Sequence, residues 1–191
     1  SSLLRYGGDI AVGAMTILSS VMQFCQMPSY GLAQGAQPIM SYNYGAGNLQ
    51  RVKKTFGLLL LWSMCYSLVV WLAVILLPGV FAGIFTPDAE LMAYSASALR
   101  IYCAVLFVMG IQAACQMAFV SLGKAGSSIL VAAVRKFVLL IPLIYIMPAL
   151  MEDKVRAVYM AEPVADVLAV SFTALLFVFS FRKVLKESEK S

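Results

Sequence analysis

Residues 57–77 read GLLLLWSMCYSLVVWLAVILL, a run without a single charged side chain. A helix needs about 20 consecutive apolar residues to cross the hydrocarbon core of a bilayer. This run reaches that length, and it lies inside a longer charge-free stretch from Thr55 to Pro87. It therefore predicts a membrane-spanning helix.

The composition of the whole chain points the same way. Of its 191 residues, 62% are hydrophobic and 12% are charged, whereas a soluble domain has roughly 45–50% apolar and about 25% charged residues. A soluble fold of this length cannot bury so much apolar surface. We therefore expect the lipid bilayer to be a partner. The net charge of +5 does not indicate a nucleic-acid partner, because the basic residues flank apolar runs instead of forming a basic face.

Four further apolar runs have spanning length, two of them interrupted by charges. We expect these charges to snorkel to the headgroups or to face a wet cavity. The prediction is an all-α fold, a polytopic membrane helix bundle of about five transmembrane helices. The expected helices cover residues 10–42, 55–85, 91–122, 127–150 and 161–183, followed by a polar cytoplasmic tail over 184–191.

The distribution of lysine and arginine predicts the orientation. Five crossings put eight of these residues on one side and three on the other. The larger set is Arg51, Lys53, Lys54, Lys124, Arg182, Lys183, Lys186 and Lys190, and the smaller is Arg5, Lys154 and Arg156. Basic residues concentrate on the cytoplasmic side, so we expect a cytoplasmic C-terminus.

Enzymatic chemistry is not expected. The chain contains no histidine, and its four cysteines lie singly inside apolar runs without a CxxC pair. The sequence therefore predicts no metal site and no cofactor.

The first expected helix carries two stripes. On a helical wheel, Gln23, Gln26, Tyr30, Gln34, Gln37 and Ser41 fall within an arc of about 80°. An amide facing lipid is costly, so this stripe predicts the lining of a cavity, with interhelical hydrogen bonding as the alternative. The second stripe contains Pro28, Gly31, Gly35 and Pro38. It predicts close packing and a kink, which is either static or the break of a transporter helix.

Two later apolar runs also carry polar or charged side chains that are candidates for the cavity lining. Gln112 and Gln116 are one helical turn apart, and we expect them to face the same cavity. Arg135 and Lys136 lie within the fourth run, and two interpretations stay open. Either one of them faces the cavity while the other reaches the headgroups, or both snorkel.

Glu162 and Asp166 form an ionisable pair on one helix face, on either side of Pro163. If the helix starts here, both acids are stabilised by its dipole. The functional alternative is a site for a proton, Na⁺ or a cationic substrate.

The stretch from Gly31 to Asn48, GLAQGAQPIMSYNYGAGN, resembles the signature of the multidrug and toxic compound extrusion (MATE) family, especially bacterial members of the MepA type. Shorter segments are similar as well. They are Tyr6–Asp9 (YGGD), Arg51–Lys53 (RVK), Ser121–Gly123 (SLG) and Pro163–Asp166 (PVAD).

The resemblance implies a twelve-helix transporter of two six-helix lobes, of which this chain is helices eight to twelve, a partial C-terminal lobe. It implies export of cationic or amphipathic compounds in exchange for Na⁺ or H⁺. Gln34, Gln37, Tyr30, Gln112, Gln116 and Arg135 would line the cavity, and Asp166 or Glu162 would couple the ion. Some Na⁺-coupled members carry an acid midway along the tenth helix. Residues 109–115 here contain none, so that site does not carry over.

Two alternatives remain open. One is a lipid-linked oligosaccharide flippase of the same superfamily, for which Arg100 and Arg135 are the only obvious cavity cations. The other is an inactive fragment that lacks its N-terminal lobe, since the chain begins at Ser1-Ser2 without a methionine and is interpreted as starting internally.

Overall fold

A computed structural model of the protein describes residues 2–188. All regular elements in this range are helical, so the all-α prediction is confirmed. In chain order they are α1 (Ser2–Gly45), α2 (Leu49–Leu76), α3 (Pro78–Phe85), α4 (Ala89–Tyr102), the short 3₁₀ helix η1 (Leu106–Val108), α5 (Met109–Ser121), α6 (Ala125–Ala133), the π-helical segment η2 (Val134–Leu140), α7 (Ile141–Leu150) and α8 (Lys154–Ser188).

The helices have the lengths of a multi-pass membrane protein. Four segments are long and apolar enough to cross a bilayer: Gly7–Gly45, Leu49–Leu76, Gly126–Leu150 and Lys154–Glu187. The pair Ala89–Tyr102 and Leu106–Ser121, bent by 52°, has the length and composition of a span when taken together, which gives up to five spans. Large apolar side chains are exposed along these segments, including Trp62, Val69 and Phe179. Such a surface suits lipid rather than water, and the predicted polytopic bundle is confirmed.

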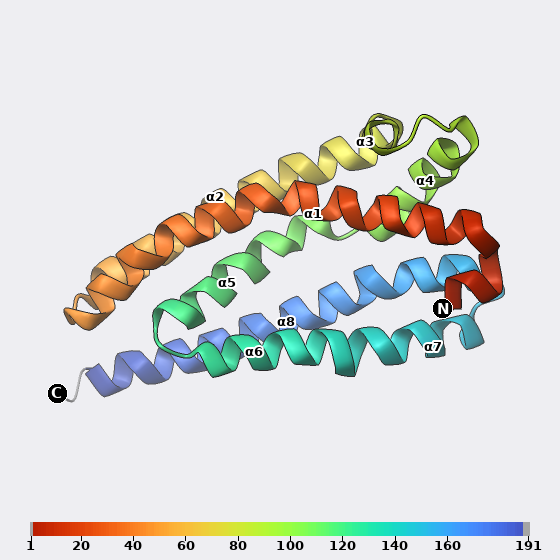
Figure 1. The fold of residues 1–191 in the computed structure, drawn as a ribbon. Helices are drawn as coiled ribbons and strands as arrows, with labels where there is room; N and C mark the ends of the chain where they lie inside the picture. The colour runs from red at the N-terminus through yellow and green to blue at the C-terminus, as the bar shows by residue number, and fades with distance from the viewer. Residues whose placement is uncertain (1, 189–191) are drawn as a thin grey trace.

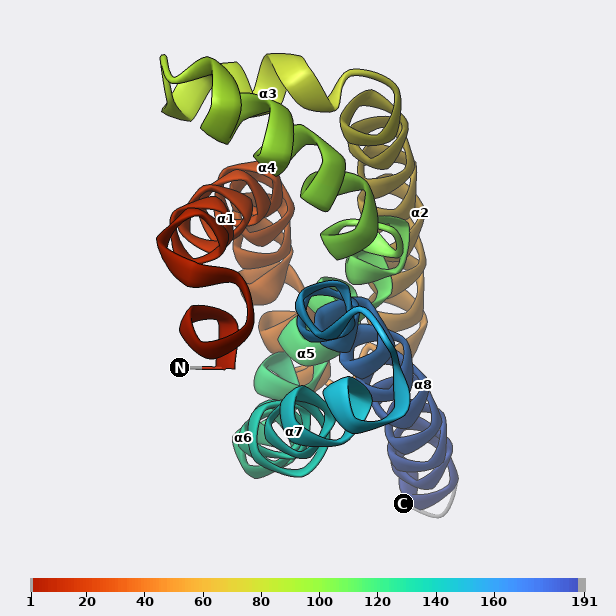
Figure 2. The same ribbon diagram turned by 90° about the vertical axis from the view of Figure 1, so that its right-hand side faces the viewer.

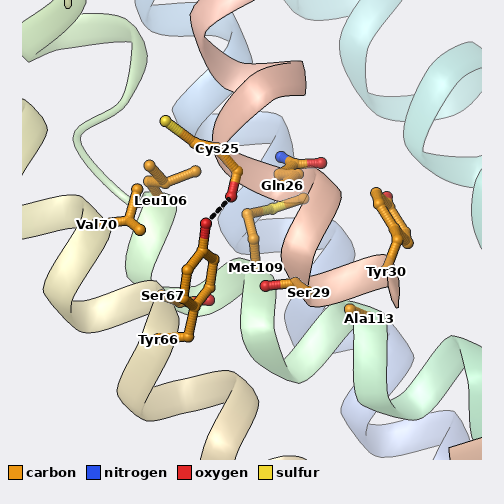
Figure 3. A pocket seen from close by; sticks show the side chains of 10 residues that line it. All are labelled: Cys25, Gln26, Ser29, Tyr30, Tyr66, Ser67, Val70, Leu106, Met109 and Ala113. Carbon is orange, nitrogen blue, oxygen red and sulfur yellow. Dashed lines mark hydrogen bonds between the residues drawn. The ribbon is translucent and has the colours of Figure 1, made fainter. Parts of the chain in front are cut away.

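Helix α5 occupies the middle of the bundle. It contacts α1 and α2 on one side and α6 and α8 on the other, and Figures 1 and 2 show it between these two layers. The α2–α5 contact is close at Gly110, where an added Cβ would lie 2.6 Å from the carbonyl oxygen of Ser63. On the α1–α2 side, the Tyr66 hydroxyl donates to the Cys25 carbonyl at 2.9 Å (Figure 3).

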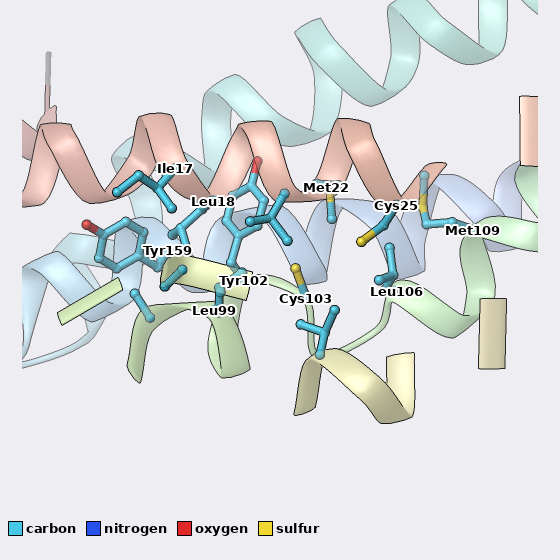
Figure 4. Close-up of a cluster of buried hydrophobic side chains, with 14 of the residues drawn as sticks. Ile17, Leu18, Met22, Cys25, Leu99, Tyr102, Cys103, Leu106, Met109 and Tyr159 are labelled. Carbon is cyan, nitrogen blue, oxygen red and sulfur yellow. The ribbon is translucent and has the colours of Figure 1, made fainter. Parts of the chain in front are cut away.

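The largest buried apolar cluster joins α1, α4 and α8 at one end of the bundle. Leu18, Leu99 and Cys103 are fully buried in it, and Figure 4 shows Tyr102 and Tyr159 among the same side chains. The Tyr159 hydroxyl also donates to the Ala11 carbonyl at 2.7 Å, which ties α8 to α1.

Two predicted helices are broken, and each break has a local cause. The expected helix 55–85 ends at Leu76, and α3 starts at Pro78. Proline lacks an N–H and disfavours helical geometry in the residue before it, and Leu77 is accordingly non-helical (φ −126°, ψ 52°). The expected helix 91–122 bends between Tyr102 and Leu106. There the indole Nε1 of Trp71 donates to the Ala104 carbonyl at 2.7 Å, which satisfies an acceptor at the break.

The outer helices also differ from the prediction at their ends. Helix α1 starts at Ser2 and contains a break at Gly8, whose φ of 67° and ψ of −162° favour glycine. Helix α8 starts at Lys154 rather than at 161, and it continues through the expected tail to Ser188. Residues 189–191 of that tail lie outside the described range.

Candidate functional site

A polar cavity of about 340 Å³ opens among α1, α5, the α6–η2 region and α8. Its lining residues are Ser19, Met22, Gln23, Gln26, Tyr30, Tyr102, Met109, Gln112, Gln116, Ala132, Arg135, Lys136 and Glu162. The structure therefore brings together eight of the residues singled out in the sequence: Gln23, Gln26, Tyr30, Gln112, Gln116, Arg135, Lys136 and Glu162. We refer to this space as the polar cavity.

Arg135 joins two carboxylates at the edge of the polar cavity. Its Nη2 donates to Glu162 Oε2 at 2.9 Å, and its Nε donates to Asp166 Oδ1 at 2.8 Å. Nη2 also contacts Asp166 Oδ1. The side chains of Asp166 and Glu162 are 1% and 11% exposed, while that of Arg135 is 19% exposed. These three residues form a charged triad with a formal charge of −1 when both acids are ionised.

The helices position the triad in different ways. Glu162 and Asp166 are one turn apart on α8, so both carboxylates reach the same side of that helix. Arg135 comes from η2, where the π-helical segment interrupts the span formed by α6 and α7. Single π-helical turns are often found at functional sites. The triad thus connects the irregular part of one span to the middle of another.

The interpretation of the two acids as helix-start residues is wrong. Helix α8 already begins at Lys154, so Glu162, Pro163 and Asp166 lie in its interior, beyond the reach of the helix dipole at the N-terminus. Both acids pair with Arg135, a residue on another span, which offsets one of their two negative charges. The neighbouring Lys136 also lines the polar cavity, and its side chain is exposed.

Amide groups of α5 also line the polar cavity. Gln112 is buried, and within the described residues its Oε1 has no hydrogen-bond partner. Gln116 is half-buried one turn further along α5. A buried amide oxygen without a partner is costly, so this acceptor is available to water or to a polar group of a ligand.

A smaller cavity of about 10 Å³ adjoins the polar cavity between α1, α2 and α5. It shares Gln26, Tyr30 and Met109 with the polar cavity. Figure 3 shows these side chains around it, with the Tyr66–Cys25 hydrogen bond at its rim. A space of this size holds about one water molecule, so it extends the polar cavity by a single hydration site.

The remainder of the glutamine stripe lies outside the polar cavity. Gln34 is exposed and Gln37 is half-buried further along α1, and neither lines the polar cavity. The stripe was predicted from helical periodicity alone. Further along α1, the side of the helix that meets α5 is apolar: Ala33 and Met40 belong to a buried cluster with Phe119.

The glycine and proline stripe does not pack against another helix within residues 2–188. Pro28, Gly31, Gly35 and Pro38 are all exposed, and an added Cβ at either glycine would meet nothing within 4 Å. The only non-helical residue inside α1 is Gly8, so the helix is not broken at either proline. The close packing and the break predicted for this stripe are therefore absent from the described part of the chain.

Sequence reasoning missed several lining residues and the triad itself. Tyr102, Met22 and Ser19 line the polar cavity, but they lie in apolar runs whose pattern does not distinguish them from core residues. The signal for the triad was present, because a cation and two acids inside membrane spans are expected to pair. Their partnership depends on the packing of η2 against α8, which the sequence pattern does not specify.

The fold and this site define a class of protein: a multi-pass membrane protein with a charged and amide-lined cavity inside its helix bundle. The MatE family model matches residues 1–146. The chain belongs to this family, whose members are transporters.

Comparisons with individual proteins agree with the family assignment. Over 147 residues the chain is 25% identical to the multidrug export protein MepA of Staphylococcus aureus (strain N315), a match that covers 77% of this chain and 32% of that protein. A ligand-bound solved structure of the MATE multidrug transporter DinF-BH is 33% identical, with a TM-score of 0.80, and the match covers 96% of this chain and 41% of that one.

A MATE structure in the bent conformation superposes with a TM-score of 0.92 at 18% identity, covering 99% of this chain and 42% of the other. This second likeness concerns the fold alone. The chain spans less than half the length of each of these relatives.

Proposed function

We propose that this chain is part of a secondary antiporter that exports cationic or amphipathic compounds in exchange for Na⁺ or H⁺. The observation that carries the proposal is the charged triad at the edge of the polar cavity. Ionisable groups inside membrane spans mark ion and substrate pathways. The names of two relatives, a multidrug export protein and a multidrug transporter, support the same activity.

The triad provides a coupling site because its charges are unequal. One guanidinium faces two carboxylates, so a single further positive charge neutralises the group. Within the described residues, Asp166 Oδ2 is buried and has no hydrogen-bond partner, so it is the atom at which a proton or a cation would bind. Binding there weakens the attraction between Asp166 and Arg135, and hence the link between η2 and α8.

Exchange follows if a cationic substrate and the coupling ion compete for the same carboxylates. Glu162 lines the polar cavity, whereas Asp166 lies behind it. A cation in the cavity meets Glu162 first, and its charge favours the ionised form of both acids. A proton or Na⁺ at Asp166 neutralises the negative charge of the triad, which weakens its attraction for a cation in the cavity and favours release of the substrate. Gln112, Gln116 and Tyr30 would orient the polar groups of the substrate.

The partner of this chain would be the N-terminal lobe of the same transporter. The exposed stripe of Pro28, Gly31, Gly35 and Pro38 is a candidate contact for it, since small residues allow helices to approach closely. Rocking of the two lobes would give alternating access. We propose a cytoplasmic C-terminus on the basis of the lysine and arginine distribution. The bacterial cell membrane is proposed because the named relative is a Staphylococcus aureus protein.

The flippase alternative is less well supported by the cavity. A pyrophosphate group requires cations that are not already neutralised, and Arg135 is paired with two acids. Lys136 is the other cation that lines the polar cavity, while Arg100 lines a different groove on α4. An inactive fragment remains the outcome expected if these 191 residues are expressed without a second lobe.

Ethidium efflux from drug-sensitive cells tests the proposal. The full-length protein and its Asp166→Asn variant are compared at matched expression, with Glu187→Gln as the control. Glu187 is an exposed acid near the other end of the same helix, and it pairs with Lys183 on the surface. We expect Asp166→Asn to abolish efflux and Glu187→Gln to leave it unchanged. Unchanged efflux in Asp166→Asn contradicts the proposed coupling role, and absent efflux in the unmodified protein favours the flippase.

A further inference from the structure

Two neighbouring cavities lie between α4 and α8, away from the polar cavity. One has about 510 Å³ and an almost entirely apolar lining, and the other has about 580 Å³ and a mixed lining. They share Arg100, Ile101 and Arg156. A polar space and an apolar space that meet at two arginines match the two parts of an amphiphile with an anionic headgroup.

The two arginines carry charge that this part of the fold does not balance. Both residues are exposed, and neither forms an ion pair within residues 2–188. Arg100 donates from Nε to the Ile75 carbonyl at 3.2 Å, which fixes its side chain while leaving its charge uncompensated. Asp153 lines the mixed cavity as well, and its Oδ1 accepts from the backbone N–H of Arg156 at 3.0 Å. The three side chains sum to +1.

Arg100 lies within a bent pair of helices that together have the composition of a membrane span. An arginine in a spanning segment is costly unless it reaches the headgroups or a counter-ion. Guanidinium groups match phosphate in geometry and bind it through two parallel hydrogen bonds. At a lipid-exposed position, the phosphate of an anionic phospholipid supplies that counter-ion.

The apolar cavity has the lining and length expected for an acyl chain. Its lining includes Ala104 and Val105 at the break in the bent pair, and Pro163, Val164 and Leu168 along α8. From Arg156 to Leu168 the helix rises by about 18 Å. One leaflet of the hydrocarbon core is about 15 Å thick. A lipid held by its phosphate at Arg156 therefore places its chain along the whole apolar cavity.

We propose that the α4–α8 groove binds an anionic phospholipid, with the phosphate between Arg100 and Arg156 and one acyl chain over Ala104, Val164 and Leu168. This inference is independent of the transport proposal, since it uses none of the residues of the polar cavity. Bound lipid would link α8 to the break between α4 and α5.

Native mass spectrometry of the delipidated full-length protein tests this site. The probes are dioleoyl phosphatidylglycerol and dioleoyl phosphatidylcholine, titrated separately. We expect the anionic lipid to bind about tenfold more tightly, and Arg100→Gln/Arg156→Gln to reduce that preference to about twofold or less. Arg100→Lys/Arg156→Lys retains both charges and should keep most of the preference. This variant separates loss of charge from loss of folding.

Two further variants test the position of the lipid. Ala104→Trp fills the apolar part of the groove while both arginines remain, and it should weaken binding of the anionic lipid about tenfold. Arg182→Gln/Lys186→Gln removes two exposed cations near the other end of α8 and should leave the preference unchanged. The proposal is overturned if this control loses as much preference as Arg100→Gln/Arg156→Gln, or if the latter variant keeps it.

Discussion

Replacing Arg135 with glutamine should lower the free energy of unfolding by about 3 kcal/mol. Arg135 donates hydrogen bonds to both carboxylates, and Asp166 is 1% exposed. Removing one partner of a buried ion pair costs about 3–5 kcal/mol, because the remaining charge is left without compensation. We take the lower end of this range, since Glu162 borders the polar cavity and can be hydrated there.

A double-mutant cycle separates this effect from a general loss of packing. Asp166→Asn alone leaves Arg135 paired with Glu162 and should cost less than about 1.5 kcal/mol. Adding Asp166→Asn to Arg135→Gln removes the uncompensated buried charge, and it should recover about half of the lost stability. Lys136→Gln is the matched control, because it removes an adjacent exposed cation and should change stability by less than about 0.5 kcal/mol.

These differences in the free energy of unfolding can be measured by circular dichroism. The purified full-length protein is unfolded reversibly in mixed micelles of detergent and dodecyl sulfate. The reasoning is refuted if Arg135→Gln is no more destabilised than Lys136→Gln. It is equally refuted if the two substitutions in the cycle are additive, because independent effects would mean that Arg135 does not balance the charge of Asp166.

Three further substitutions test contacts of the fold in the same unfolding assay. Gly110→Ala drives a methyl group into the α2 backbone at Ser63 and should cost about 1–3 kcal/mol, whereas Gly126→Ala, at a position with open space, should cost nothing measurable. Tyr66→Phe removes the hydrogen bond to the Cys25 carbonyl and should cost about 1 kcal/mol, and no change would show that this bond is not formed. Gly8→Ala places a side chain at a φ of 67° and should cost about 1–3 kcal/mol, so an unchanged midpoint would argue against the break in α1.

The membrane spans could be predicted from the sequence because their signal is local. A charge-free run such as residues 57–77 has no alternative to a bilayer-spanning helix, and the structure has α2 there. The helix breaks were harder to predict from the sequence. Pro78 gives a local reason for the end of α2, but the bend after Tyr102 is accompanied by a hydrogen bond from Trp71, a residue on another helix.

The candidate site was predictable only in part, for the same reason. Helical spacing correctly placed Gln112 and Gln116 on one face, and Glu162 and Asp166 on another. It could not place Arg135 against those acids, because that contact joins residues 27 and 31 positions apart on different spans. It also placed Gln34 and Gln37 on the same stripe of α1, and their role in lining a cavity stays a prediction.

The central claim is that substrate and coupling ion compete for the carboxylates of the charged triad. It is tested most directly by ethidium binding to the purified full-length protein. Fluorescence polarisation measures the affinity as pH is lowered and, separately, as the Na⁺ concentration is raised. If substrate and coupling ion compete for the carboxylates of the charged triad, ethidium affinity falls in at least one of these titrations, and Asp166→Asn removes that dependence. An affinity that responds equally in the unmodified protein and in Asp166→Asn would contradict the account, because the coupling ion would then bind elsewhere.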